Sequence, residues 1–536
     1  MTVHDSAPAG PTAERRADVD EASDDRRGLL TIAIVGVVAT LVTAIGTWRP
    51  SLWYDEAATV SATDRPLPDM MGLLGHVDAV HTGYYLLMHL WLDATGSFGL
   101  TQFGLRLPSA VGVGVAAAGL TALGTRVGGR RFGITAAVVF VALPRIQWAG
   151  SEARPYALAV ALTVLAALAA VIAGERGGAG RWILQWFLAT LASSWFAIAI
   201  LLLPVHVAWA WHAGGRRSVR PAIVSAVASA CLSLPFLVLA HGQSGQISWI
   251  PPFGWRTLGD YVRDEFLMVD DTRLWSVMLG GVIAVLTVAA IVSAVASMRG
   301  GGERARSLAG VTAIGVFWVV GPAVVLLVYS ALATPTYTPR YLAVTAPGLA
   351  LVVAQGIRVL SQRWVLRAIV VLVLVGLSVP AYLHQREPYG RTGGTDFSQV
   401  AQHVRDNAHP GDCVAFQQTF SWSPQSQRII ATAEPDDFRG LRILAGSSRI
   451  RENALWDGEP DPTTYRAWMQ TCRVVWVLAD RDRTTSSRIR PDGGTYWYFE
   501  PNRFVDTPIH ALAVSAGLHE TSRTSFHNSQ VVRMDR

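Results

Sequence analysis

The feature that most constrains this chain is its series of long apolar runs. Runs able to cross a bilayer occur at 28–48, 106–125, 131–146, 155–174, 221–241, 274–298, 308–333, 341–360 and 365–384. A membrane-spanning helix needs about 20 such residues. The stretch 182–212 is longer and is interrupted by Ser193-Ser194-Trp195 and by Pro204, so it predicts two short spans. The sequence therefore predicts a polytopic α-helical membrane protein with about eleven spans.

The remaining sequence is polar and divides the chain into three parts. Only 16% of the 536 residues are charged, whereas a soluble globular protein carries roughly a quarter. Nearly all of the apolar excess lies in residues 28–384, which we expect to form the transmembrane domain. Residues 1–27 are polar with mixed charges and predict a disordered cytoplasmic tail.

Residues 385–536 predict a small extracytoplasmic α/β domain. A helix is expected over 396–408 with Asp396 as its N-cap, and another over 507–518. Strands are expected at 413–416, 472–480 and 529–534. Cys413 and Cys472 both fall here, and the sequence leaves open whether they form a disulfide.

Arginine clusters predict how the chain crosses the membrane. Cytoplasmic loops are rich in basic residues, so Arg26 and Arg27 place the N-terminus in the cytoplasm. Later clusters lie at 126–131, 216–220, 299–306 and 358–367. All of them face the cytoplasm only if residues 81–98 do not span the membrane. We therefore expect 81–98 to lie as a helix at the outer interface. The outer face then receives residues 49–105, 147–154, 242–273 and 334–340 and the C-terminal domain.

Composition also bears on source and partners. Every basic residue is arginine, and Ala, Val and Gly are abundant, which is typical of a GC-rich bacterial genome. We therefore expect a multi-pass protein of a bacterial plasma (inner) membrane. The net charge of +6 is modest and lies in short clusters between apolar runs, which indicates topology signals and no nucleic-acid partner.

Two adjacent acids, Asp55 and Glu56, follow the first span and are preceded by Trp53 and Tyr54. Charge near lipid is costly, so acids at this depth usually have a function. A carboxylate there can accept the proton of a reacting hydroxyl, and carboxylate oxygens also suit a divalent cation such as Mg²⁺ or Mn²⁺. Two solvated acids at the end of a helix are the competing interpretation.

Arginines at the outer ends of spans make the functional interpretation stronger. Arg106, Arg154 and Arg340 lie where basic residues are not expected, and guanidinium groups bind phosphate well. Snorkelling to lipid headgroups is the alternative for any one of them. Other polar or aromatic residues of the outer loops are candidate substrate ligands: Tyr54, His81, Tyr84, Tyr85, Glu152 and Tyr341.

Four segments together resemble a known family. WYDEAAT after the first span, RLPSAVGV, EARPYALAVAL and PRYLAVTAPGLAL are similar to segments of bacterial membrane mannosyltransferases related to the protein O-mannosyltransferases. These enzymes belong to the GT-C class, which uses polyprenyl-phosphate sugar donors. The resemblance covers roughly residues 28–385. It departs at His81-Thr82-Gly83-Tyr84-Tyr85, where relatives often have two prolines.

The resemblance implies a membrane glycosyltransferase that works outside the cytoplasm. It implies transfer of a hexose, mannose first, from a polyprenyl phosphate to a lipid, glycan or protein hydroxyl, with inversion at the anomeric carbon. Asp55 would be the catalytic base, with Glu56 as its rival, and Arg106 would contact the donor phosphate. Alternatives are transfer of another sugar such as arabinose or an aminosugar, a lipid-linked sugar flippase or transporter, and a non-catalytic assembly or sensor protein.

Overall fold

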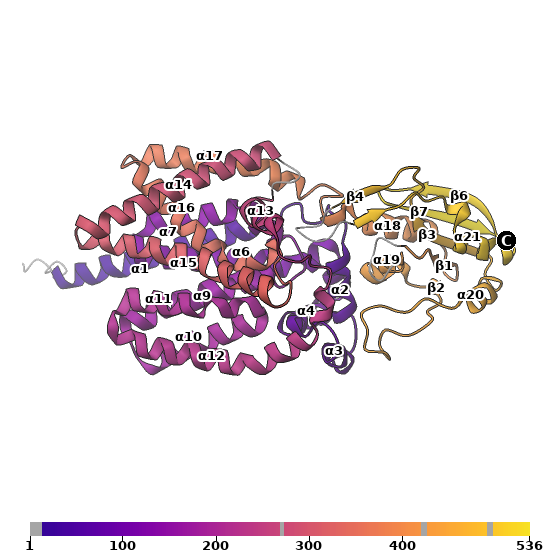
Figure 1. The fold of residues 1–536 in the computed structure, drawn as a ribbon, viewed down its shortest axis with the longest axis horizontal. Helices are drawn as coiled ribbons and strands as arrows, with labels where there is room; N and C mark the ends of the chain where they lie inside the picture. The colour runs from indigo at the N-terminus through magenta and orange to yellow at the C-terminus, as the bar shows by residue number, and fades with distance from the viewer. Residues whose placement is uncertain (1–12, 269–272, 420–425, 490–496) are drawn as a thin grey trace, which may run out of the picture.

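The computed structural model describes residues 13–268, 273–419, 426–489 and 497–536, and it contains a helical bundle joined to an α/β domain (Figure 1). The bundle helices run side by side and the α/β domain caps one end of them. The bundle is formed by α1 (Ala13–Ala44), α6 (Gln102–Gly128), α7 (Arg130–Ala142), α8 (Pro144–Gly150), α9 (Tyr156–Arg176), α10 (Ala179–Trp195), α11 (Leu203–Gly214), α12 (Arg216–Gly242), α14 (Arg273–Gly300), α15 (Glu303–Leu332), α16 (Ala346–Leu360) and α17 (Trp364–His384).

Among the described residues, nine helices are long and apolar enough to cross a membrane, or ten if the bent pair α7–α8 is one span. The bend of 72° falls at Leu143, whose extended backbone precedes Pro144. The short helix α10, with 17 residues, lies outside this count and accounts for the difference from about eleven. The break near Phe196 confirms that 182–212 is two elements. The protein is therefore a multi-pass membrane protein.

Two expectations about the N-terminal half have different outcomes. The interfacial helix predicted in 81–98 is α4 (Thr82–Thr95), and its 14 residues are too few to span. Helix α1 begins at Ala13, within the stretch predicted as a disordered cytoplasmic tail, and its candidate membrane span begins at Arg26. The tail itself stays a prediction, and residues 1–12 lie outside the described part.

Small residues let the bundle helices approach closely. A Cβ added to Gly36 of α1 would lie 3.1 Å from the Cβ of Ala118 on α6. A Cβ added to Gly124 of α6 would lie 2.6 Å from the Cα of Gly133 on α7. In lipid, where association depends on van der Waals contact, such close approach is a main source of helix–helix stability.

Shorter helices cover the end of the bundle that faces the α/β domain; we call this the loop end. They are α2 (Tyr54–Thr63), α3 (Leu67–Leu74), α5 (Ser97–Leu100) and α13 (Trp255–Asp264), with 3₁₀ turns η1 (Ala79–His81), η2 (Ala197–Leu202), η3 (Ser244–Ile247) and η4 (Pro339–Thr345).

The C-terminal domain is built on a five-stranded sheet of order β2-β1-β3-β7-β6. Strand β1 pairs in parallel with β2 and β3, while β7 runs antiparallel between β3 and β6. The strands are β1 (Cys413–Phe416), β2 (Arg442–Ile443), β3 (Val474–Asp480), β6 (His519–Ser525) and β7 (Ser529–Asp535), with a separate pair β4 (Ser487–Ile489) and β5 (Trp497–Phe499). Its helices and turns are η5 (Thr392–Gly394), α18 (Phe397–Asn407), α19 (Ile429–Ala433), η6 (Pro435–Phe438), α20 (Pro462–Met469), η7 (Phe504–Asp506) and α21 (Pro508–Ser515).

All three strands and both helices predicted in this domain are confirmed, and Cys413 and Cys472 are joined in a disulfide. The predicted N-cap hydrogen bond of Asp396 is absent. Its carboxylate instead accepts hydrogen bonds from the backbone N–H of Asn528 and Ser529 at the start of β7. Burial raises the pKa of this carboxyl group.

An apolar core shared with the loop end holds the domain in place. Phe397 of α18 and Ile430 of α19 are buried in the same cluster as Leu52 and Leu74 of the loop end. Helix α19 packs directly on α2. The α/β domain is therefore fixed against the segment that carries Asp55 and Glu56.

Candidate active site

Helix α2 turns the two adjacent acids toward different surroundings. Trp53 is extended and the helix starts at Tyr54, so Asp55 and Glu56 occupy its first turn, where the helix dipole favours negative charge. Successive residues of an α-helix point about 100° apart. Asp55 consequently lines a cavity, whereas Glu56 is fully buried in the protein.

Glu56 forms a closed ion pair with Arg106 of α6. Arg106 Nε and Nη2 donate to the two carboxylate oxygens at 2.7 and 2.6 Å. The remaining N–H groups of Arg106 donate to the carbonyl oxygens of Thr47, Pro50 and Ser51. Burial raises the pKa of Glu56, but the Arg106 and Arg391 guanidinium groups and the Ala153 N–H together outweigh burial, so the net pKa is lowered.

This geometry corrects two expectations. All five N–H groups of Arg106 are satisfied by the protein and neither residue of the pair lines the cavity, so we withdraw Arg106 as a phosphate ligand. Glu56 also accepts a hydrogen bond from Ala153 N at 3.0 Å, which leaves it unsuited to serve as a base. The pair fastens α2 to α6 and to the end of α1.

Asp55 lies between two arginines that come from distant parts of the sequence. Arg340, in η4, places Nη1 2.9 Å from Asp55 Oδ2, and Arg154 places Nε 3.9 Å from the same oxygen. The Arg340 guanidinium also lies over the rings of Trp53 and Trp249, at 5.6 and 5.2 Å from their centres. The carboxylate of Asp55 thus faces two cations, while a second carboxylate of the cavity lining, Asp78, lies near Arg154.

Arg154 is held by a second layer of polar side chains. Its Nη1 donates to Tyr85 Oη at 3.1 Å, and Tyr85 in turn donates to Asp78 Oδ2 at 2.7 Å. Its Nη2 lies 2.8 Å from His81 Nε2. Because guanidinium only donates, Nε2 must be the acceptor and the imidazole proton must sit on Nδ1. Burial and the neighbouring arginines hold the pKa of His81 well below its usual value, so the ring is neutral.

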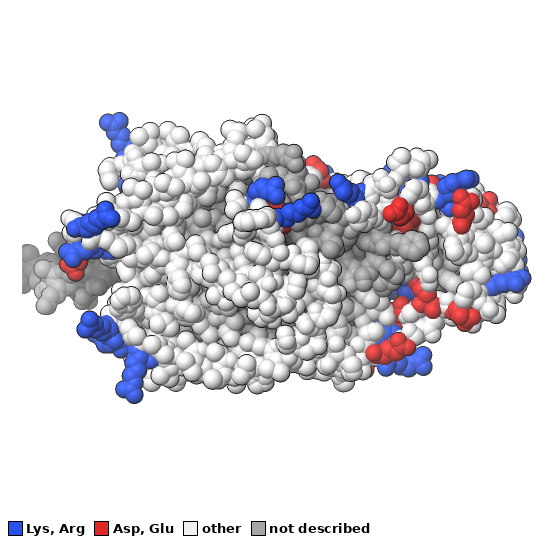
Figure 2. Space-filling model, viewed as in Figure 1, with Lys and Arg blue, Asp and Glu red and all other residues white. Residues whose placement is uncertain are grey.

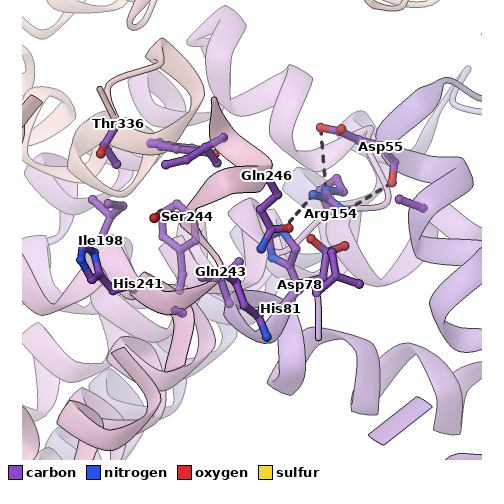
Figure 3. Close-up of a pocket in the computed structure, with 18 of the residues that line it drawn as sticks. Asp55, Asp78, His81, Arg154, Ile198, His241, Gln243, Ser244, Gln246 and Thr336 are labelled. Atoms are coloured by element: carbon purple, nitrogen blue, oxygen red, sulfur yellow. Dashed lines mark hydrogen bonds and ion pairs between the residues drawn. The ribbon is translucent and has the colours of Figure 1, made fainter. Parts of the chain in front are cut away.

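The cavity beside Asp55 has a volume of about 870 Å³ and two unlike ends (Figure 3). Asp55, Asp78, His81 and Arg154 lie together at one end, while Ile198 lies at the other. The end with Ile198, called the apolar end, is lined mostly by apolar side chains from η2 and the bundle helices α12 and α15, which include Ile198, Ile200, Leu201, Leu237, Val325, Leu326 and Tyr329. The polar residues His241, Ser244 and Thr336 also lie there. Such a shape suits an amphipathic ligand whose charged group reaches the arginines.

A loop of the C-terminal domain, residues 447–458, forms one wall of the polar end. Leu455 and Trp456 line the cavity, and the Trp456 ring lies 5.5 Å from that of Tyr54. Arg65 Nη2 donates to the carbonyl oxygen of Ala454 at 3.2 Å, and Ser61 Oγ donates to that of Leu455. We call residues 447–458 the wall loop.

A buried carboxyl group lies behind the site. Glu152 is fully buried, and neither of its carboxylate oxygens has a hydrogen-bond partner among the described residues. Burial, with the nearby charges of Asp55 and Glu56, raises the pKa of Glu152 to about 8. Arg391 is buried nearby, and burial lowers its pKa to about 9, while its Nη2 donates to the carbonyl oxygen of Ser151.

The structure brings only part of the predicted site to the cavity. Of the sequence candidates, its lining contains Tyr54, Asp55, His81, Arg154, Arg340 and Tyr341. Tyr84, Tyr85 and Glu152 are buried outside the lining, and Tyr84 packs edge-on against Trp195. The sequence did not single out Trp249, Trp456 or Arg391, because each reaches the site through contacts with residues more than 90 positions away.

The residues present do not fit a divalent cation shared by Asp55 and Glu56. Glu56 is occupied by Arg106, and Asp55 by Arg340. Within residues 13–268, 273–419, 426–489 and 497–536, no three His, Cys, Asp or Glu side chains are grouped as metal ligands. The positive charge of the site is supplied by arginine.

The bundle, its loop-end helices and its C-terminal sheet domain together have the fold of the GT-C class of membrane glycosyltransferases. The structure of ArnT from Cupriavidus metallidurans in the apo state matches with a TM-score of 0.53 and 12% identity, over 95% of this chain and 98% of that one. The arabinofuranosyltransferase AftD from mycobacteria matches with a TM-score of 0.52 and 16% identity, over 95% of this chain. The chain spans 40% of the length of AftD. No protein-family model and no curated protein sequence matches the chain.

Proposed function

We propose that the protein is a glycosyltransferase that moves a hexose, mannose as the first assignment, from a polyprenyl phosphate to an acceptor hydroxyl. The observation that carries this proposal is the cavity itself, which joins an apolar end between bundle helices to a carboxylate flanked by two arginines. A lipid flippase would need polar or broken helices at mid-membrane depth. The described ionisable groups of this cavity gather instead at the loop end.

The donor's two halves match the two ends of the cavity. The polyprenyl chain would lie against Ile198, Leu237 and Leu326, where burial of apolar surface stabilises it. The phosphate would bind Arg340 and Arg154, whose guanidinium groups suit phosphate oxygens. The sugar would then lie beside Asp55.

In this proposal Asp55 accepts the proton of the acceptor hydroxyl as its oxygen attacks the anomeric carbon. The bond from that carbon to the phosphate oxygen breaks, and its electron pair leaves with the polyprenyl phosphate. Attack from the face opposite the phosphate inverts the anomeric centre. Arg340 and Arg154 would stabilise the charge that grows on the leaving phosphate.

The ion pair between Asp55 and Arg340 fits this scheme. In the structure Arg340 holds the Asp55 carboxylate in an ion pair at 2.9 Å. A donor phosphate that shares Arg340 would draw the guanidinium away from Asp55 and thereby free the carboxylate for the acceptor hydroxyl. Binding of the donor would thus prepare the base for the proton transfer.

In this proposal the wall loop would bring the C-terminal domain next to the acceptor. Trp456 and Tyr54 both line the cavity with Asp55, and aromatic faces pack well against the C–H face of a sugar ring. A glycan or glycolipid is therefore the acceptor class that we favour over a protein. We place the loop end and the C-terminal domain outside the cytoplasm, in line with the arginine clusters.

The test is a transfer assay on purified protein with polyprenyl-phosphate mannose, arabinose and aminosugar donors and bacterial membrane lipid extract as acceptor. Asp55→Asn keeps the size of the side chain and should lower turnover by about 10²-fold or more, the usual loss when a general base is removed. Glu387→Gln, an exposed acid near the same end, is the matched control and should keep full activity. Unchanged transfer by Asp55→Asn would overturn the proposal.

A further inference from the structure

A second cavity lies at the end of the bundle farthest from the C-terminal domain. It has a volume of about 780 Å³ and is lined by residues of α7, α16 and α17 and the turns beside them. This volume lies within the range of pockets that bind small molecules. The cavity shares no lining residue with the candidate active site.

Four arginines give this cavity its charge: Arg130 and Arg131 at the start of α7, Arg358 near the end of α16, and Arg367 in the first turn of α17. No acidic side chain lines it. Among the described residues none of the four forms an ion pair, whereas Arg126, one turn before α7, pairs with Glu175 at 3.1 Å.

The hydrogen bonds of these arginines leave donors free for a ligand. Arg358 Nη1 donates to the carbonyl oxygen of Gly128 at 3.3 Å. Arg367 donates to the carbonyl oxygens of Ser361 and Arg358, at 2.6 and 3.1 Å, and to Gln362 Oε1 at 3.3 Å, while Arg130 donates to Thr31 Oγ1 of α1. The bonds of Arg358 and Arg367 fix these two guanidinium groups on helix ends, yet they use only a few of the ten N–H groups of the two side chains.

The rest of the lining is apolar and continues along the helices. Phe132 and Val138 of α7 lie on one side, and Trp364, Val371 and Leu372 of α17 on the other. Figure 2 shows arginines at this end of the molecule and an uncharged flank beyond them. A ligand that fits must carry negative charge at the helix ends and apolar chains along the bundle.

We propose that this cavity binds an anionic glycerophospholipid, with its phosphate among Arg130, Arg131, Arg358 and Arg367 and its acyl chains between α7 and α17. Basic pockets between membrane helices are suited to acidic lipid headgroups. Guanidinium matches phosphate oxygens better than a point charge does. A zwitterionic lipid supplies its own cation and has less to gain from four unpaired arginines.

The site has a structural consequence for the active site. Helix α7 continues through α8 to the loop with Arg154, α16 follows η4 with its Arg340, and α17 leads to Arg391. The three helices that line the lipid cavity therefore carry three arginines of the loop end. A lipid that bridges their far ends would hold the spacing of those arginines.

Native mass spectrometry of the purified protein, titrated with phosphatidylglycerol or phosphatidylcholine, tests this proposal. The double variant Arg358→Gln/Arg367→Gln should bind phosphatidylglycerol roughly 30-fold more weakly, about fivefold for each arginine near an anionic headgroup. Phosphatidylcholine binding should not change. The control Arg299→Gln/Arg306→Gln removes the same charge from exposed positions at the same end and should bind like the wild type.

Further variants separate charge from folding. Arg358→Lys/Arg367→Lys keeps the charge and should bind within about threefold of the wild type. Arg131→Gln alters an exposed side chain and should weaken binding about fivefold without affecting the fold. Three results would each overturn the proposal: equal affinity of the double glutamine variant and its control, equal affinity of the wild type for both lipids, and full displacement of the lipid by millimolar inorganic phosphate.

Discussion

The buried pair of Glu56 and Arg106 predicts that one arginine of the loop end governs stability and not turnover. Arg106→Met would remove five N–H donors from a site with no exposure to solvent. It would leave the Glu56 carboxylate buried with a single remaining donor, Ala153 N, and would orphan three carbonyl oxygens, those of Thr47, Pro50 and Ser51.

Removing one partner of a buried ion pair costs about 3–5 kcal/mol because the other charge stays uncompensated. This corresponds to more than 100-fold in the ratio of folded to unfolded protein. Arg126→Met, on the same helix, is the matched control. Its pair with Glu175 is one-third exposed, so its loss should cost no more than about 1 kcal/mol.

The assay is the temperature at which half of the monomer is lost on heating in detergent, followed by size-exclusion chromatography. Arg106→Met should unfold at a clearly lower temperature than Arg126→Met, and Glu56→Met/Arg106→Met should recover part of the loss because no lone charge remains. Transfer per folded molecule, and the KM for the donor, should stay near wild type in Arg106→Met. A variant as stable as Arg126→Met, or a stable variant with a raised donor KM, would refute the structural role.

Three further predictions concern the site itself. Arg340→Ala should weaken donor binding or turnover by about 10²-fold, because it removes charge stabilisation at the leaving phosphate. Arg263→Ala, on the exposed face of α13, should have no such effect. Both variants are compared by kinetics at varied donor concentration. Burial raises the pKa of Glu152 to about 8, so its contribution to stability is complete below the pKa of this group in the unfolded chain and is lost as pH rises through about 8. The unfolding temperature of Glu152→Gln should therefore rise relative to that of the wild type between pH 6 and pH 9. A difference that stays constant over this range would contradict the prediction. Trp456→Ala should raise the KM for a glycan acceptor about tenfold while the donor KM changes less than twofold, and Trp456→Phe should largely restore the acceptor KM. Substitution of the half-buried Trp468 of the same domain by Ala serves as the control. Equal effects of Trp456→Ala on both substrates would argue for general damage to the fold.

Much of the fold could be predicted because the membrane imposes a length on each span. Apolar runs of the required length gave the bundle, and arginine clusters correctly separated the short α4 from the spans. A turn followed by short apolar sequence predicted β1, a continuous apolar run predicted β3, and residues 529–534 were predicted as the final strand, β7. The short strand β2 and the mostly exposed strand β6 were missed, because neither has a buried run to signal it.

The site was harder to predict because neighbouring residues in a helix face different directions. Asp55 and Glu56 look equivalent in the sequence, yet one lines the cavity and the other is sealed by Arg106. An arginine at the outer end of a span signals an anion, but that anion can be a phosphate or a buried carboxylate. Only the tertiary contacts show that Arg340 lines the cavity whereas Arg106 is paired with the buried Glu56.

The wall loop also has a consequence for the order in which the protein matures. The hydrogen bond between Ser61 and Leu455 joins residues 394 positions apart in the chain. At about 5–20 residues per second, ribosomes would need roughly 20–80 seconds to synthesise the stretch between them. During that interval the first loop is already in place while the wall beside Asp55 has not yet been made. A nascent or truncated chain would therefore hold an open, unfinished site, and competence for catalysis would arise only with the last folded domain.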